Sequence, residues 1–178
     1  MDAQIDRLIE LHADRAFAIA LRMAGNRADA EDIVQEAFLR VIKYMKSYDP
    51  TQPFEAWLAQ IIRNVYINSL RLEARRRCVP LSAAPGDEDA LSLEEVLADP
   101  SPGPQELALA QGRKKELHAA LADLSPTLRM AVILADLEGM GREECARALG
   151  CSLSAFDVRL HRGRSKLRER LQASGGTA

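Results

Sequence analysis

The chain has 178 residues, 47% of them hydrophobic but only 4% aromatic, and a formal net charge of −2. This length can bury one sizeable core or two small ones, and the abundance of Ala, Leu, Arg and Glu favours helices over a β-sheet. No apolar run reaches the ~18–20 residues of a membrane span, and the amphipathic, acidic N-terminus is unlike a signal peptide, so we expect a cytoplasmic protein that is not inserted in a membrane. The three cysteines lack a CxxC pair and a histidine cluster, which argues against a disulfide framework and a zinc site.

Residues 1–77 are predicted to form three helices and the first of two domains. Apolar residues recur at helical spacing from residue 8 to residue 24, where the first helix ends. Asn26 then suits the N-cap of a second helix, whose apolar stripe leaves a polar face on the opposite side. Pro53 suits the start of a third helix, which ends in the basic run 71–77. The polar face of the second helix consists of Asp29, Asp32, Gln35, Glu36 and Arg40.

Helical periodicity stops between residues 78 and 104. This stretch is rich in Pro, Gly and Ser, and it carries acidic residues but no Lys or Arg. Such a composition is typical of a flexible linker. We therefore expect an all-α fold in which two small helical domains are joined by a flexible acidic linker.

Residues 105–173 are predicted to form the second domain, followed by a tail at 174–178. Its last two helices are joined by a tight turn at Gly150, and Ser152 suits the cap of the final helix. Two helices joined in this way form a helix-turn-helix, a motif that places its second helix in the major groove of DNA.

The final helix carries a cluster of arginines although the net charge of the chain is slightly negative. A cluster of one sign attracts polyanions, and in a helix-turn-helix the N-terminal residues of the second helix reach base edges while flanking cations meet phosphates. The residues predicted to read bases are Ser154, Ala155, Asp157 and Val158, and those predicted to bind phosphates or guanines are Arg159, Arg162 and Arg164. The alternative is a solvated terminal helix packed on a bundle.

A second basic surface is predicted along the third helix and implies a second contact with nucleic acid. It consists of Arg63, Asn64, Asn68, Arg71, Arg75, Arg76 and Arg77. Aromatic residues near its start are of the kind that stack on unpaired bases, namely Tyr48, Phe54, Trp57 and Tyr66. For Phe54 and Trp57, packing in the core is at least as good an interpretation, because both lie on the apolar stripe.

The run DAEDIVQEAFLRVIKYMKSYDPTQPFEAWLAQIIRNVYINSLR (residues 29–71), together with the helix-turn-helix, resembles the extracytoplasmic function (ECF) group of sigma-70 factors. The resemblance covers nearly the whole chain. It implies that residues 29–41 dock on the coiled coil of the β′ subunit of RNA polymerase. The residues implied to bind core polymerase are Asp29, Asp32, Ile33, Gln35, Glu36, Leu39 and Arg40.

By the same resemblance, the first domain is sigma region 2, which reads and melts the promoter −10 element, and the second is region 4, which reads the −35 element. Ser47 and Asp49, in the turn before the third helix, then join the predicted −10 surface. The implied partners are core polymerase through its β′ and β subunits, promoter DNA, and an anti-sigma factor between the two domains; no cofactor, metal or small-molecule substrate is implied. Three residues depart from the family's usual pattern: Asp157 in the recognition helix, Gly141 at a helix cap and Cys145 in the core.

Three other functions were weighed against this one. An enzyme is disfavoured because the sequence has no G-x-S-x-G, P-loop or H-E-x-x-H motif. Lone histidines such as His118 and His161 are usually structural or exposed. We therefore expect no catalytic activity. A helix-turn-helix regulator that acts without polymerase would need an exposed apolar seam to dimerise, whereas the second helix offers a charged face. A non-transcribing mimic that binds an anti-sigma factor would present the same surfaces as a true sigma factor.

Overall fold

The computed structural model describes residues 3–77 and 104–175, and all regular structure in these two ranges is helical, as predicted. The N-terminal half contains α1 (Ala3–Ala24), α2 (Arg27–Tyr44), a short 3-10 turn η1 (Met45–Ser47) and α3 (Phe54–Arg77). The C-terminal half contains α4 (Pro104–Ala122), α5 (Pro126–Val132), the π-turn η3 (Ile133–Leu137), α6 (Arg142–Ala148) and α7 (Leu153–Gly175). The predicted linker lies outside the described residues except for residue 104, and the first two residues of the predicted tail, 174 and 175, belong to α7. The domain boundaries remain a prediction.

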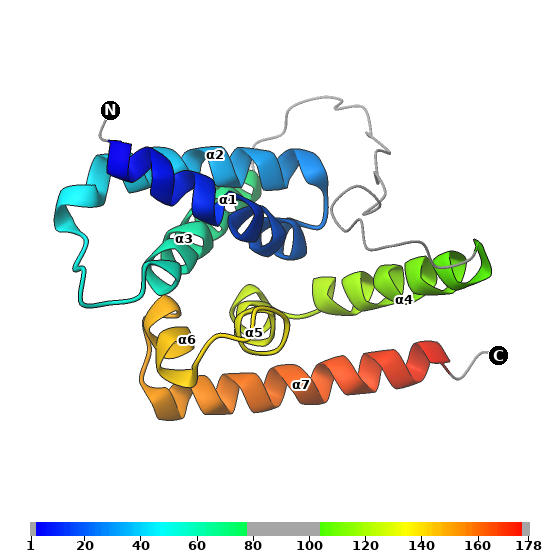
Figure 1. Ribbon diagram of the computed structural model, residues 1–178. Helices are drawn as coiled ribbons and strands as arrows, with labels where there is room; N and C mark the ends of the chain where they lie inside the picture. The colour runs from blue at the N-terminus through cyan, green and yellow to red at the C-terminus, as the bar shows by residue number, and fades with distance from the viewer. Residues whose placement is uncertain (1–2, 78–103, 176–178) are drawn as a thin grey trace.

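The N-terminal half is a three-helix bundle (Figure 1). Each of its helices contributes apolar residues to the buried core. Gly25 has a φ of 94°, a left-handed conformation that glycine adopts without strain, and it ends α1. The side chain of Asn26 then accepts a hydrogen bond from the backbone N–H of Asp29 at 2.9 Å, which caps α2 as the sequence predicted. This tight connection forces α1 and α2 to run alongside each other.

In the C-terminal half, α7 is the longest helix and runs along one edge of the molecule, against α4 and α5 (Figure 1). A left-handed residue, Gly150 at φ 59°, makes the turn between α6 and α7, and the hydroxyl of Ser152 accepts from the N–H of Ala155 at 3.3 Å to cap α7. The helix-turn-helix is therefore present with the predicted turn and cap.

A π-turn at the end of α5 is an element that the sequence did not predict. The backbone N–H of Glu138 reaches the carbonyl of Ile133 at 2.9 Å, a span of five residues where an α-helix spans four. The larger turn lets Asp136 and Glu138 bond to different partners: Asp136 pairs with α7, and Glu138 with α1.

The two halves pack against each other and share one cluster of buried apolar residues. Helix α3 packs on α6, while α1 contacts α4, α5 and η3. In Figure 1 the N-terminal bundle accordingly lies directly over α5 and α6. Among the described helices, none combines the length and the apolar character that crossing a membrane requires.

Candidate polymerase-docking and nucleic-acid interfaces

The polar face of α2 is exposed, as the sequence predicted for a docking surface. The side chains of Asp29, Asp32, Gln35 and Glu36 all face solvent, and Leu39 stands out from the same helix with 62% of its surface exposed. Arg40 is partly covered and donates from its Nε to Glu36 at 2.7 Å. An exposed leucine among acids is what a partner with basic and apolar side chains would contact.

Ile33, which the family resemblance includes among the polymerase-binding residues, does not share the exposure of this face. Ile33 is only 4% exposed, because it belongs to the apolar stripe that α2 turns toward the other two helices of the bundle. It still lines the floor of a pocket of about 340 Å³ that opens between α2 and α3. The residues lining this pocket are Ala24, Asp29, Asp32, Ile33, Tyr66, Ser69, Leu70, Leu72 and Glu73.

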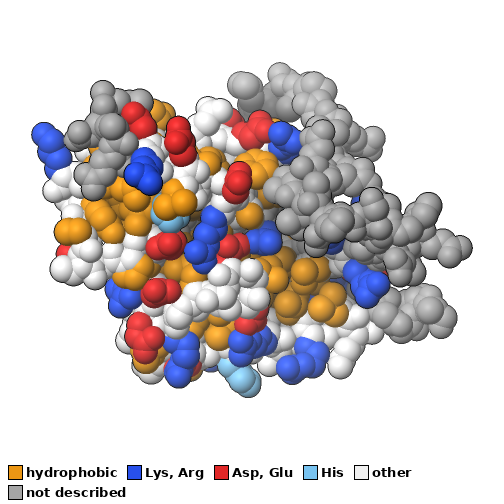
Figure 2. Space-filling view, viewed as in Figure 1, with side chains coloured by type: hydrophobic (Ala, Val, Ile, Leu, Met, Phe, Trp, Pro, Cys, Tyr) orange, Lys and Arg blue, Asp and Glu red, His pale blue; other side chains and the backbone are white. Residues whose placement is uncertain are grey.

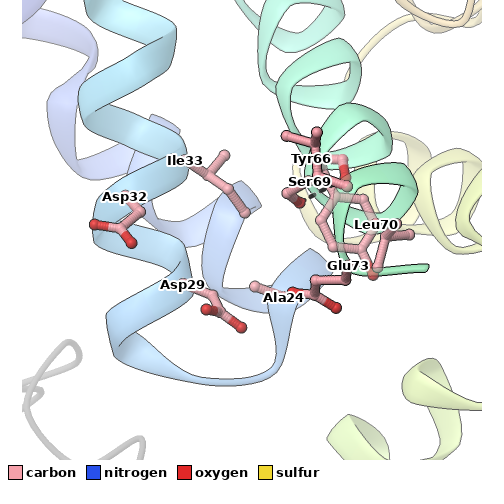
Figure 3. Close-up of a pocket in the computed structure, with 9 residues that line it drawn as sticks. Ala24, Asp29, Asp32, Ile33, Tyr66, Ser69, Leu70 and Glu73 are labelled. Atoms are coloured by element: carbon pink, nitrogen blue, oxygen red, sulfur yellow. Dashed lines mark hydrogen bonds between the residues drawn. The ribbon is translucent and has the colours of Figure 1, made fainter. Parts of the chain in front are cut away.

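The pocket extends the acidic face of α2 onto α3. In Figure 3, Ile33 points from α2 toward α3, while Asp29 on α2 and Glu73 on α3 lie toward the same end of the pocket, and Asp32 lies on the outer side of α2. An apolar floor with a carboxylate rim suits a side chain that is apolar along its stem and positively charged at its end, such as Arg or Lys. Sequence spacing within α2 alone gave no sign that Glu73 would join this surface.

The polar side chains in the turn before α3 form hydrogen bonds with neighbouring residues of the turn. The hydroxyl of Ser47 donates to the carbonyl of Tyr44 at 2.7 Å. The carboxylate of Asp49 accepts from both the N–H and the hydroxyl of Thr51, and these hydrogen bonds lower its pKa below the ordinary value of 3.8. Both predicted −10 residues are exposed, and Asp49 in addition shapes the turn that leads into α3.

The polar face of α3 presents Asn64, Asn68, Arg71 and Arg75 to solvent at helical spacing. Arg71 and Arg75 make no ion pair with any other residue that the structure describes. Arg76, also predicted for this surface, has a side chain outside the described part. The geometry therefore brings together the predicted −10 residues of the later turns of α3.

Arg63 does not lie on this face. It is half-buried against the C-terminal half, and its guanidinium donates to the carbonyl of Ala148 at 3.2 Å. Burial, and secondarily the nearby charge of Arg159, lower the pKa of Arg63. In this arrangement Arg63 contacts the helix-turn-helix, which the sequence could not indicate because the two lie far apart along the chain.

Of the four aromatic residues considered for base stacking, two are buried, and for Phe54 this is the core packing that the apolar stripe offered as the alternative. Tyr66 is 6% exposed and its hydroxyl accepts a hydrogen bond from Arg129, while Phe54 is 7% exposed. Tyr48 and Trp57 remain half-buried, with ring centroids 4.9 Å apart. The apolar stripe of α3 decided this outcome, because residues at its centre are enclosed by α1 and α2.

The residues of the first turns of α7 that are predicted to read bases differ in their exposure to solvent. Ser154 and Val158 are exposed, Val158 to 50%, whereas Ala155, Asp157 and Arg159 are partly covered. Phe156, between them, is fully buried and fixes the face that α7 turns inward. Arg162, one turn further, is exposed and makes no ion pair with the other described residues.

Two charged residues of α7 are held by partners on other helices. The carboxylate of Asp157 accepts two hydrogen bonds from Arg142, the first residue of α6, with the Nε–Oδ1 distance at 3.0 Å. These hydrogen bonds raise the pKa of Arg142. Arg164 pairs in the same two-pronged way with Asp136. Asp157 is therefore already neutralised where it would face phosphate. The sequence analysis did not identify Arg142 as its partner, because Arg142 lies on α6, the helix before α7.

Comparison with known proteins now decides the family. The Sigma-70 region 2 model matches residues 8–76, and the Sigma-70 region 4 model matches residues 114–167. The chain is 36% identical to RNA polymerase sigma factor CarQ of Myxococcus xanthus, over 92% of this chain and 87% of CarQ. It is 34% identical to ECF RNA polymerase sigma factor EcfG of Rhodopseudomonas palustris, over 96% of this chain and 85% of EcfG. The chain belongs to the ECF group of the sigma-70 family.

A longer relative and a solved structure extend this comparison. The sigma factor is 38% identical to ECF RNA polymerase sigma factor SigE of Mycolicibacterium smegmatis over 93% of its own length, but it spans only 61% of SigE. Its fold matches CnrH, solved in complex with the cytosolic domain of CnrY, with a TM-score of 0.65, 25% identity, and coverage of 97% of this chain and 90% of that one. This structural match covers both halves of the chain, so it includes the folds of region 2 and region 4.

Proposed function

We propose that this sigma factor directs core RNA polymerase to promoters by docking through α2 and by binding DNA through α3 and the α6–α7 motif. One observation carries the proposal most strongly: Arg71, Arg75 and Arg162 face solvent without an acidic partner among the described residues. Exposed arginines that are not neutralised internally are free to displace counterions from phosphates. The protein would have no active site of its own, and it would act where the polymerase is, in the cytoplasm.

The proposed polymerase contact is the acidic face of α2. Asp29, Asp32, Gln35, Glu36 and Leu39 would meet the β′ coiled coil, with Arg40 at the edge, and the pocket that Asp29 and Asp32 help to line would take a basic side chain. Charge complementarity of this kind governs the rate of association and the choice of partner. Contact with the β subunit remains an expectation from the family.

The proposed promoter contacts use two helices. Asn64, Asn68, Arg71 and Arg75 of α3 would bind the −10 element, with Arg76, Ser47 and Asp49 flanking them. On α7, Ser154, Ala155 and Val158 would reach base edges of the −35 element while Arg159, Arg162 and Arg164 meet phosphates or guanines. The Asp157–Arg142 pair would lie beside this surface as a neutral unit, with Arg142 offsetting the negative charge of Asp157.

We also propose that an anti-sigma factor controls the protein. CnrH was solved with the cytosolic domain of CnrY, and RpoE of Bartonella quintana was solved with the anti-sigma factor NepR. The RpoE chain has 24% identity to this one and a TM-score of 0.70, which supports the fold. An anti-sigma partner would have to cover either the acidic face of α2 or the two DNA-binding faces to block initiation.

Run-off transcription with purified core polymerase, followed by mapping of the start sites, tests the proposal. Reversing Asp32 and Glu36 to Lys should weaken core binding on a gel-filtration column without changing helical content, and Arg162→Glu should abolish start-site-specific transcripts while leaving core binding intact. Separate losses in the two variants distinguish docking from DNA recognition. Elution of the wild-type chain as a free dimer beside core polymerase would instead favour a regulator, and stable core binding without any transcript would favour a mimic.

A further inference from the structure

Asp157 is the first acidic residue of α7, and a single guanidinium from α6 holds it at both carboxylate oxygens. Its Oδ1 accepts from Nε of Arg142 at 3.0 Å, and its Oδ2 accepts from Nη2 of the same side chain. The planar fork of an arginine matches a carboxylate in this way, and the match fixes the direction of both groups. The carboxylate of Asp157 is therefore held in one orientation on α7.

The place of Asp157 in the helix-turn-helix puts this oriented carboxylate at the end of α7 that would reach DNA bases. Asp157 is the fifth residue of α7, and the first residues of the second helix are those that contact base edges in such a motif. Phe156 and Leu160 are buried, so the core sets the rotation of α7 about its axis. Ser154 and Val158 are exposed on either side of Asp157, and 39% of the Asp157 side chain is itself open to solvent.

The Asp157–Arg142 pair adds no net charge to this face. Figure 2 shows Lys and Arg side chains along the lower edge of the molecule, where α7 lies, and Asp or Glu side chains near its left end, where α6 meets α7. Attraction to phosphate comes from the unpaired cations, whereas the pair offers directed hydrogen bonds. A carboxylate has about four lone-pair positions, of which Arg142 occupies two, so two remain to accept from another donor.

A group that can only accept hydrogen bonds distinguishes the bases by what each presents in the major groove. Guanine and thymine present acceptors there, which repel a carboxylate, whereas cytosine and adenine each present an amino donor. In adenine this donor lies beside the N7 acceptor, which would face the second oxygen of the carboxylate. The amino group of cytosine has no acceptor of the same base beside it. A carboxylate held in one orientation therefore favours cytosine.

We propose that Asp157 reads a cytosine of the −35 element by accepting a hydrogen bond from its N4 amino group, and that Arg142 is the positioning residue that orients the carboxylate. The inference rests on the proposed function, since it takes α7 to lie in the major groove of that element. Asp157 then sets the preferred base at one position, while exposed arginines such as Arg162 supply affinity. Because Asp157 departs from the usual pattern of the family, this preference belongs to this chain in particular.

Selection from a pool of random duplexes tests the proposal. The full-length chain is assembled with purified core polymerase and mixed with duplexes whose random segment is long enough to hold both promoter elements, and the bound fraction is sequenced. Asp157→Asn keeps the shape of the side chain but presents an amide, and Arg142→Lys keeps the charge but loses the planar fork. Glu143→Gln is the matched control, because it removes the same charge from an exposed acid of α6 that has no ion pair to the described residues.

The wild type should enrich cytosine at one position of the −35 element by about fivefold, the low end for one good base contact. Asp157→Asn should lose this enrichment and favour adenine at the same position, because an amide bonds both N6 and N7 of adenine. Arg142→Lys should reduce the enrichment of cytosine without creating another preference, and Glu143→Gln should select the same sequences as the wild type. Circular dichroism checks that the variants are folded, as expected for changes in an exposed ion pair.

A cytosine preference that persists in Asp157→Asn would overturn the proposal, and so would a wild-type selection that contains no such position. If Arg142→Lys weakens binding to all duplexes alike and leaves the base preference unchanged, the pair only joins α6 to α7, and Arg142 has no positioning role. Failure of the proposed function has a different result: the wild type would then select no sequence at all, and run-off transcription would show no specific start sites.

Discussion

The two cationic helices of this sigma factor, α3 and α7, hold their charges in different ways. On α3, Arg71 and Arg75 face solvent without an acidic partner among the described residues. On α7, Arg164 is held by Asp136 of η3, and Arg170 by Asp123, the residue that follows α4. Counting arginines therefore overstates the positive charge that α7 offers to DNA, and understates the relative contribution of α3.

Charge reversal on α3 should have the largest effect. The double variant Arg71→Glu, Arg75→Glu should weaken promoter binding by the holoenzyme by about 100-fold and flatten its salt dependence, because two phosphate contacts are lost and replaced by repulsion. Arg164→Ala should cost less than about threefold, because its partner Asp136 already neutralises it. Filter binding at several salt concentrations measures both, with Lys115→Glu on α4 as the control. Equal losses in the α3 and α7 variants would remove the distinction.

The close packing that brings α7 against α5 can be tested without DNA. A β-carbon added at Gly163 would lie 2.8 Å from Cγ2 of Val132 and 3.2 Å from the carbonyl oxygen of Leu128, so Gly163→Ala should lower the free energy of unfolding by about 1–3 kcal/mol. Gly112→Ala on α4 is the matched control: nothing lies within 4 Å, and the same change there should raise the free energy of unfolding by about 0.5–1 kcal/mol. Urea titration measures the difference. A stable Gly163→Ala variant would mean that α5 and α7 are less tightly apposed.

The Arg142–Asp157 pair should give the smallest and most diagnostic effect. Arg142→Ala leaves the carboxylate of Asp157 bare and should weaken binding to −35 duplex DNA by about threefold, whereas Asp157→Asn should strengthen it by a similar factor at low salt. The variant with both changes should bind nearly as the wild type, because the pair is neutral as a unit. Competition between duplexes at fixed salt measures the affinities. If Arg142→Ala has no effect, Asp157 does not face the DNA.

Local signals in the sequence predicted most of the helices. The cap at Asn26, the left-handed glycines Gly25 and Gly150, and the cap at Ser152 each act within a few residues, so their effects can be read from neighbouring letters. The π-turn at 133–137 was not predicted, because the apolar pattern there is compatible with a continuous helix. Its extra residue affects contacts that are distant in the chain: Asp136 pairs with α7, and Glu138 meets α1 more than a hundred positions away.

The docking and DNA faces were predicted in outline and corrected in detail. Helical spacing correctly placed the acids of α2 and the later residues of α3 on exposed faces. It did not foresee that Tyr66 would be enclosed, or that Arg63 would turn toward α6. Periodicity defines which residues share a face, but the neighbouring element decides whether that face stays open.

The sequence by itself determined the all-helical class, the positions of the caps and turns, and the family to which the chain belongs. These follow from short-range physics: helical periodicity, capping hydrogen bonds and the conformational freedom of glycine. Only the tertiary structure decided which charges are available, since Asp157 and Arg164 are neutralised by residues of other helices and Arg129 is buried by contacts from both halves. Electrostatic pairing depends on distances in space, and those distances are set by how the helices pack.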